Sequence, residues 1–198
     1  MRMRWKFFRL MLLVAVLAMP ARANMISNGD FETGDFTGWW TWVADSDNQS
    51  VTIDSDYKYE GSYSAKFWSA SSAWSAQMGQ SFDIGEGVSW TLSFAYSARW
   101  TPEWGSAGVA VDYVDADWNY LDYEWVELYD ESPAPNPDEW VLVSNDYITP
   151  AGTAHINLKF EAANWTTVNF DNISAVPEPT TILLLGLGGL ALRRRKKA

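Results

Sequence analysis

Carboxylates make up most of the side chains in this sequence that could do chemistry. Glu124 and Glu127 lie three residues apart, and Asp112 and Asp115 repeat that spacing. A glycosidase needs two carboxyl groups facing one another across a cleft, with separately tuned pKa values. The acids here are spread along the whole chain, so no pair stands out. The single histidine, His155, has no serine or cysteine motif near it. We therefore expect a protein that is not an enzyme.

Tryptophan is the second chemical feature, with 13 residues in the sequence. A flat indole buries the apolar face of a sugar ring while polar groups bind the hydroxyls at its rim. Exposed aromatic side chains can equally mark a protein–protein contact, and the sequence leaves both readings open. Trp39, Trp68 and Trp90 are expected in the core, although Trp39 also belongs to a cluster with Trp40 and Trp42. The carbohydrate-binding candidates are Trp100 and Trp104 in a loop, Trp118 and Tyr120 at a hairpin turn, and Trp125 on the following strand.

The elements that must position these residues are strands. Over residues 88–97, large apolar residues alternate with small polar ones, which is typical of a half-buried antiparallel strand. No window predicts an amphipathic helix. Eight or more short strands without helices indicate an all-β sandwich of two antiparallel sheets. Residues 24–176 have the length of one domain, and nothing in them marks a second. The other predicted strands are 51–54, 63–69, 75–82, 109–113, 140–148, 156–160 and 168–173.

Charge is unevenly distributed along the chain. The formal net charge is −11, but only Lys58, Lys66, Arg99 and Lys159 are basic between residues 24 and 179, against all 25 acidic residues. That region therefore carries a net charge of about −21. Such a surface repels nucleic acid and anionic membranes but accepts neutral glycans and divalent cations. The sequence contains no cysteine, so disulfides do not stabilise it.

The N-terminus has the pattern of a signal peptide over residues 1–23. Four basic residues precede an apolar run over 10–19, and Ala21-Arg22-Ala23 is a small-x-small cleavage site. The apolar run is short for a membrane-spanning helix. We expect cleavage and export across the inner membrane.

The C-terminus, residues 177–198, joins three parts: the box Pro177-Glu178-Pro179, an apolar stretch over 180–192 and a terminal basic cluster. The stretch is shorter than the roughly 20 residues that span a bilayer, which suits a transient inner-membrane association. Basic residues favour the cytoplasmic side. The segment resembles the PEP-CTERM sorting signal of Gram-negative bacteria. The resemblance implies processing by an exosortase-type membrane protease and delivery to the cell surface or extracellular matrix.

Three phrases in the remaining domain resemble galactose-binding-like jelly rolls, including carbohydrate-binding modules of the family 4/9/22 type. They are residues 26–39, 59–66 and 168–173. The resemblance implies a jelly-roll sandwich with a sugar site on the concave sheet face or in the edge loops. It also implies a structural calcium ion with Glu32, Glu60 and Asp171 as ligands, since calcium prefers six to eight oxygen ligands. The alternative is that these acids cap turns or are solvated.

The sequence thus predicts an exported, non-catalytic carbohydrate-binding protein of the cell surface or of an exopolysaccharide and biofilm matrix. Its expected partners are a polysaccharide and the processing protease, and not nucleic acid. The alternative is a calcium-stabilised structural surface or matrix protein that acts through protein–protein contacts.

Overall fold

The computed structural model describes residues 24–70, 75–100, 105–130 and 139–178, and within these ranges every regular element is a β-strand. The predicted signal peptide, Trp104, Pro179 and residues 180–192 lie outside them. In the described part of the chain, no helix is long and apolar enough to cross a membrane. The strands are β1 (Trp40–Trp42), β2 (Gln49–Asp54), β3 (Ser64–Ser69), β4 (Ala76–Asp83), β5 (Ser89–Trp100), β6 (Ser106–Val114), β7 (Tyr120–Asp130), β8 (Val141–Ile148), β9 (His155–Ala163) and β10 (Thr166–Pro177).

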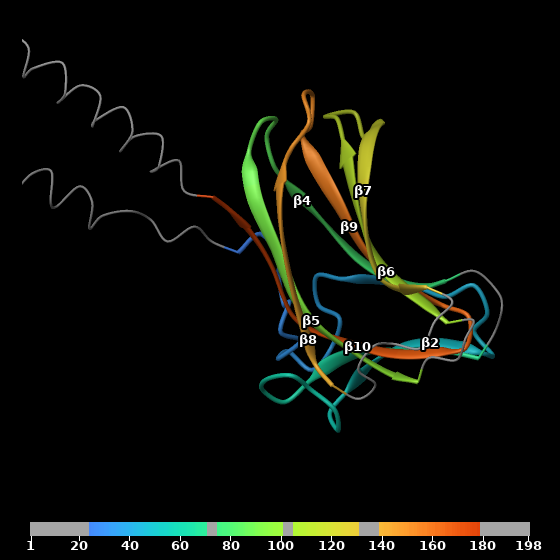
Figure 1. Cartoon of the computed structure of the whole chain (residues 1–198). Coiled ribbons are helices and arrows are strands. Elements are labelled where there is room, and N and C mark those ends of the chain that lie inside the picture. The colour runs from blue at the N-terminus through green and yellow to red at the C-terminus, as the bar shows by residue number, and fades with distance from the viewer. Residues whose placement is uncertain (1–23, 71–74, 101–104, 131–138, 179–198) are drawn as a thin grey trace, which may run out of the picture.

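The ten strands form two five-stranded antiparallel sheets that face each other (Figure 1). Sheet A has the order β1-β4-β9-β6-β7, and sheet B has the order β2-β3-β10-β5-β8. Most neighbours in space are distant in sequence, so the chain repeatedly crosses between the sheets. The predicted all-β sandwich is confirmed.

The core lies between the sheets because each strand turns alternate side chains inward. Trp90, Leu92 and Phe94 of β5 are buried, as are Leu158 and Phe160 of β9. The rings of Phe94 and Phe160 meet edge to face, with centroids 5.3 Å apart. Fully burying an aromatic side chain stabilises a fold by about 1.5–3 kcal/mol, so these contacts between the sheets supply much of its stability.

One end of the core is closed by the segment before β1. Phe31 and Trp39 are buried there with ring centroids 5.7 Å apart, as the sequence predicted for Trp39. Trp68 was predicted in the core and is 36% exposed. Its neighbour Phe67 takes the inward position on β3, and the period of two along a strand then turns Trp68 outward.

Part of the outer face of sheet B is covered by the segment between β2 and β3. Tyr57 in this segment shares a hydrogen bond with Ser97 of β5 (2.9 Å) and stacks on Trp140 at a centroid distance of 5.3 Å. Asn169 of β10 is buried beneath it and donates to Ser64. The segment therefore closes this part of the outer face of sheet B, whereas the outward side chains Leu142 and Ile148 of β8 remain exposed.

Strand β10 runs directly into the predicted sorting box. Pro177 is its last residue and pairs with Trp90, and the backbone N–H of Glu178 donates to the carbonyl of Ser89. The box thus begins at the edge of the folded domain, without an intervening linker.

Candidate functional site

The outer face of sheet A is open, and one row of side chains crosses all five of its strands. In an antiparallel sheet, directly paired residues point to the same side. A tryptophan stands at each end of the row and the only lysine of sheet A at its centre. Strand spacings of about 4.8 Å place the two ends about 19 Å apart. The row is Trp40, Gly79, Lys159, Ala110 and Trp125.

Both indoles of this row lie down on the sheet over a glycine. A Cβ atom on Gly79 would clash with the ring of Trp40, and one on Gly108 would clash with the ring of Trp125. Each ring can therefore lie close to the backbone, and the two tryptophans remain 41% and 45% exposed. Flat, partly exposed indoles fixed in this way are suited to stacking on an apolar surface of a ligand.

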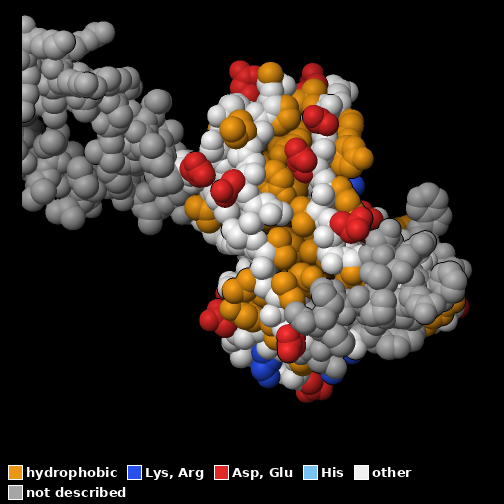
Figure 2. Space-filling model, in the orientation of Figure 1, with side chains coloured by type: hydrophobic (Ala, Val, Ile, Leu, Met, Phe, Trp, Pro, Cys, Tyr) orange, Lys and Arg blue, Asp and Glu red, His pale blue; other side chains and the backbone are white. Residues whose placement is uncertain are grey.

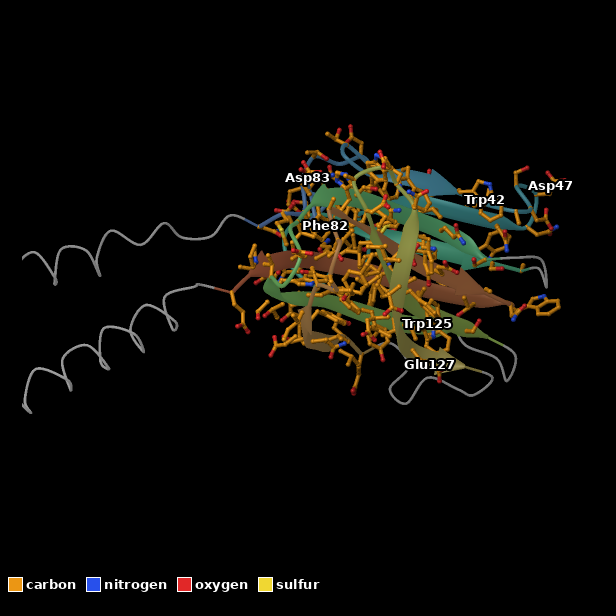
Figure 3. All side chains as sticks on the ribbon, turned by 90° about the horizontal axis from the view of Figure 1, so that it is seen from above. Trp42, Asp47, Phe82, Asp83, Trp125 and Glu127 are labelled. Atoms are coloured by element: carbon orange, nitrogen blue, oxygen red, sulfur yellow. The ribbon has the colours of Figure 1, made fainter. Side chains whose placement is uncertain are left out.

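The next row along the strands combines one tryptophan with carboxylate and amide groups. Glu161 at its centre accepts a hydrogen bond from Ser75 (3.0 Å), which in turn accepts one from Gln77. In Figure 3, Trp42 lies at one edge of the sheet, and Trp125 and Glu127 lie at the opposite edge. The row consists of Trp42, Gln77, Glu161, Gly108 and Glu127.

The row on the other side of the first row consists of polar side chains, and we call it the polar floor. Ser81, Asn157, Asp112 and Tyr123 are paired in sequence across β4, β9, β6 and β7. Ser81 donates to the side-chain oxygen of Asn157 (2.6 Å). Asp112 forms a partly buried ion pair with Lys159, with an Oδ2–Nζ distance of 3.0 Å. These groups can exchange hydrogen bonds with hydroxyl groups of a ligand.

The last row marks the end of the face, at the β6–β7 turn. It contains Asp83, His155, Val114 and Tyr120. The indole of Trp118 stacks on the imidazole of His155 at 4.4 Å with an interplanar angle of 3°. Trp118 and Tyr120 are both strongly exposed. Aromatic rings therefore lie at this end of the outer face as well as at its two edges.

The structure brings together three of the five sugar-binding candidates. Trp118, Tyr120 and Trp125 all border the outer face of sheet A, from the predicted turn and strand. Trp100 is the last residue of β5 rather than part of a loop, and its side chain, like Trp104, lies outside the described residues. The sequence identified Trp40 and Trp42 only as a cluster. The register of β1 with β4 places them at the opposite edge of sheet A from Trp125.

The two carboxylate pairs considered for catalysis do not form shared sites. Pairing turns Glu124 toward the inner side of β7, opposite Val111, and Glu127 toward the outer side, opposite Gly108. Asp112 forms an ion pair with Lys159, whereas Asp115 accepts hydrogen bonds within its own turn. Neither pair spans a cleft in the manner that glycoside hydrolysis requires.

Glu32, a predicted calcium ligand, caps the turn before β3. Its Oε1 accepts hydrogen bonds from the backbone N–H groups of Ser62 (2.7 Å) and Tyr63 (3.1 Å). The first of these is the main reason that the pKa of Glu32 is lowered. Gly61 allows the approach, since its φ is +63° and a Cβ atom there would meet the carboxyl group.

Asp171, the second predicted ligand, binds the same turn from β10. Its Oδ2 accepts from the N–H groups of Tyr59 (2.9 Å) and Glu60 (3.2 Å), and its Oδ1 accepts from Asn172. Burial raises the pKa of Asp171, the hydrogen bonds from Glu60, Asn172 and Tyr59 oppose that shift, and the nearby charge of Glu32 adds to it. Both acids therefore hold the 59–63 turn against the sandwich.

Two of the three predicted calcium ligands lie at one turn. Glu32 and Asp171 converge on one turn and offer oxygen ligands, the class that calcium prefers. The side chain of Glu60 is exposed. Within the described ranges, no three Asp, Glu, His or Cys side chains gather in a group that could hold a metal ion. Carbonyl oxygens or water would have to supply most of the six to eight ligands.

Gly108→Ala should move the Trp125 ring while leaving the indole in the protein. The three atoms nearest to the added Cβ all belong to the Trp125 indole, so we expect the ring to shift while the strand remains intact. Gly79 is a poorer test because a Cβ atom there would also lie 2.6 Å from the carbonyl oxygen of Leu158. If the ring is a binding platform, affinity should fall about tenfold, as expected for the loss of one aromatic contact.

Gly85→Ala is the matched control for this variant, because its nearest neighbour is a methyl group at 3.9 Å. Titration calorimetry with a retained polysaccharide and thermal melting would be measured for both. Equal affinity in wild type and Gly108→Ala would show that the position of Trp125 is unimportant for binding.

Two family models match the chain. Residues 23–168 match a carbohydrate binding domain, and residues 175–197 match the PEP-CTERM protein-sorting motif. No curated protein matches the sequence. The first match covers nearly all of both sheets, and the second begins within β10 and contains the box Pro177-Glu178-Pro179.

Solved structures with the same fold include several carbohydrate-binding modules. A family 16 carbohydrate binding module is 19% identical at a TM-score of 0.58, covering 77% of this chain and 99% of that one. The CBM22-1 xylan-binding domain of Paenibacillus barcinonensis Xyn10C is 17% identical at 0.54, covering 81% and 97%.

The enzymatically active domain of tailspike protein 4 from bacteriophage CBA120 is 16% identical at a TM-score of 0.65. The alignment covers 78% of this chain but 21% of the tailspike chain, so the two share one domain-sized region.

Proposed function

Because most of its length matches the family model, the chain belongs to the carbohydrate binding domain family, and we propose that it binds a neutral polysaccharide on the outer face of sheet A. The observation that carries this proposal is the row from Trp40 to Trp125, which has a flat indole at each end and lies beside the polar floor. A sugar chain laid across it would stack on the indoles while Lys159, Asp112 and Asn157 exchange hydrogen bonds with its hydroxyl groups.

The electrostatics of this face favour a neutral ligand. Glu161, Glu127 and Asp112 lie on it together with one cation, Lys159, which is already paired with Asp112. Acidic side chains also dominate the charged groups on the view in Figure 2. An anionic polysaccharide would be repelled by this field.

The two family matches make this an exported carbohydrate-binding protein, with a sorting motif that directs it to the cell envelope. We propose in addition that it is non-catalytic and belongs to an exopolysaccharide or biofilm matrix. Processing by an exosortase-type protease, with residues 180–192 held briefly in the inner membrane, would deliver it there. The separation of the carboxylate pairs supports a role in binding rather than hydrolysis.

Affinity electrophoresis of the mature chain tests the binding proposal. Soluble β-1,4-xylan, β-1,4-galactan and mixed-linkage β-glucan would each be cast into gels, with alginate as an anionic comparison. Retention by at least one neutral polymer and none by alginate is expected. Free migration in all three neutral polymers would overturn the proposal. Calcium-dependent oligomers in light scattering, together with free migration, would instead favour the structural matrix protein.

Calcium bound near Glu32 and Asp171 is a separate proposal. The pKa of Asp171 is raised mainly by burial and further by the nearby charge of Glu32, so a cation between the two carboxylates would relieve their repulsion. A bound ion stabilises the folded state by RT ln(1 + [L]/Kd), about 2.7 kcal/mol when its concentration is a hundredfold above Kd. Excess chelator should therefore lower the melting temperature, with magnesium as the control cation. An unchanged melt would leave both acids as turn caps only.

A further inference from the structure

Trp118 occupies an unusual backbone position for a large aromatic residue. It lies in the β6–β7 turn with a φ of +65° and is 56% exposed. Positive φ is uncommon for residues other than glycine and is unfavourable for bulky ones. Residues held in such conformations cluster at functional sites, where the surrounding structure fixes them. A glycine or asparagine would make this turn with less strain than tryptophan does.

The turn is fixed by Asp115. Its Oδ1 accepts from the N–H groups of Asp117 and Asn119, both at 2.9 Å, and its carbonyl accepts from Trp118 at 3.1 Å. Asn119 also donates through its side chain to both carboxylate oxygens of Asp115. These bonds hold the backbone of Trp118 in its strained conformation.

The ring of Trp118 is fixed by His155. The imidazole lies 4.4 Å from the indole and parallel to it within 3°. Its Nδ1 is 2.8 Å from Oδ1 of Asp83 on the neighbouring strand β4, which sets the plane of the ring. One face of the indole is therefore covered by His155, and the high exposure of Trp118 leaves its other surfaces to solvent.

We propose that Trp118 forms a separate sugar-stacking position at the end of the outer face of sheet A, and that His155 is the positioning residue that holds it there. This inference rests on the proposed function. His155 lies four residues along β9 from Lys159, which sets it about 13 Å from the row of Trp40 and Trp125. Trp118 would therefore contact a different sugar unit from those two indoles, and only a long enough ligand reaches both.

The test is calorimetry with fragments of the three neutral polymers, from disaccharide to hexasaccharide. Trp118→Ala should weaken binding of the longest fragments about tenfold and leave the shortest unchanged. His155→Ala should have the same effect. His155→Phe keeps a flat ring under the indole, so it should restore most of the affinity.

Trp165→Ala is the matched control, because Trp165 is also exposed, with a φ of +47°, but lies in the β9–β10 turn. Its affinity should equal that of the wild type. If the wild type binds hexasaccharides and Trp118→Ala binds fragments of every length equally well, the sugar-stacking position at Trp118 is overturned. The proposed function would then still stand. A loss in Trp118→Ala without one in His155→Ala would overturn the positioning role. Wild type that binds no fragment would overturn the proposed function itself.

Discussion

The double variant Trp40→Ala/Trp125→Ala is expected to lose retention on every polysaccharide that retains the wild type. Each indole buries apolar sugar surface and adds about 0.5–1.5 kcal/mol of aromatic contact beyond that burial. Two such platforms together contribute about 3 kcal/mol, so affinity should fall about a hundredfold. Affinity electrophoresis and calorimetry with the retained polymer would both measure this loss.

Trp68→Ala is the control for that variant. Trp68 is also a partly exposed tryptophan on a strand, but it points outward from sheet B, on the opposite side of the sandwich. It should bind like the wild type. Both tryptophans of the double variant rest on the outer surface, so the melting temperature should change little. Full affinity in the double variant would place the binding site elsewhere on the domain.

The sequence was sufficient to predict the sheets because their inner residues alternate so regularly. All but the first residue of the predicted strand 88–97 lie within β5, and its large side chains are buried: Trp90, Leu92, Phe94 and Tyr96. The same rule explains the failure at Trp68. Phe67 and Trp68 are adjacent, so a strand can bury only one of them, and composition does not say which.

The proposed binding face could not be predicted because it depends on register between strands far apart in the chain. Trp40 and Trp125 are separated by 85 positions, and only the pairing through Gly79, Lys159 and Ala110 places them in one row. A shift of one residue in any of these pairings would turn one indole toward the core. The two glycines beneath the rings were the available signal, since an isolated glycine within a strand often marks a close approach.

Asp171→Ala is expected to be the most destabilising single substitution considered for this domain. It would leave the N–H groups of Tyr59, Glu60 and Asn172 without their carboxylate acceptor, in a site where Asp171 itself is 1% exposed. An unsatisfied buried donor costs about 1–3 kcal/mol. The 59–63 turn would also lose its attachment to β10. We expect a loss of about 3 kcal/mol at neutral pH, or roughly 10 °C in melting temperature.

The pH dependence of that loss separates turn capping from metal binding. Because the pKa of Asp171 is raised in the folded state from its ordinary value of 3.8, its stabilisation is complete below that value and declines as pH rises through the folded-state pKa. In excess chelator, the stability difference between wild type and Asp171→Ala should therefore be widest in acid and narrow toward neutral pH. Asp47→Ala, which changes an exposed aspartate before β2, is the control. If the difference measured without chelator instead grew with pH, and vanished when chelator was added, Asp171 would act mainly as a ligand of a bound cation, because a metal ligand must be ionised.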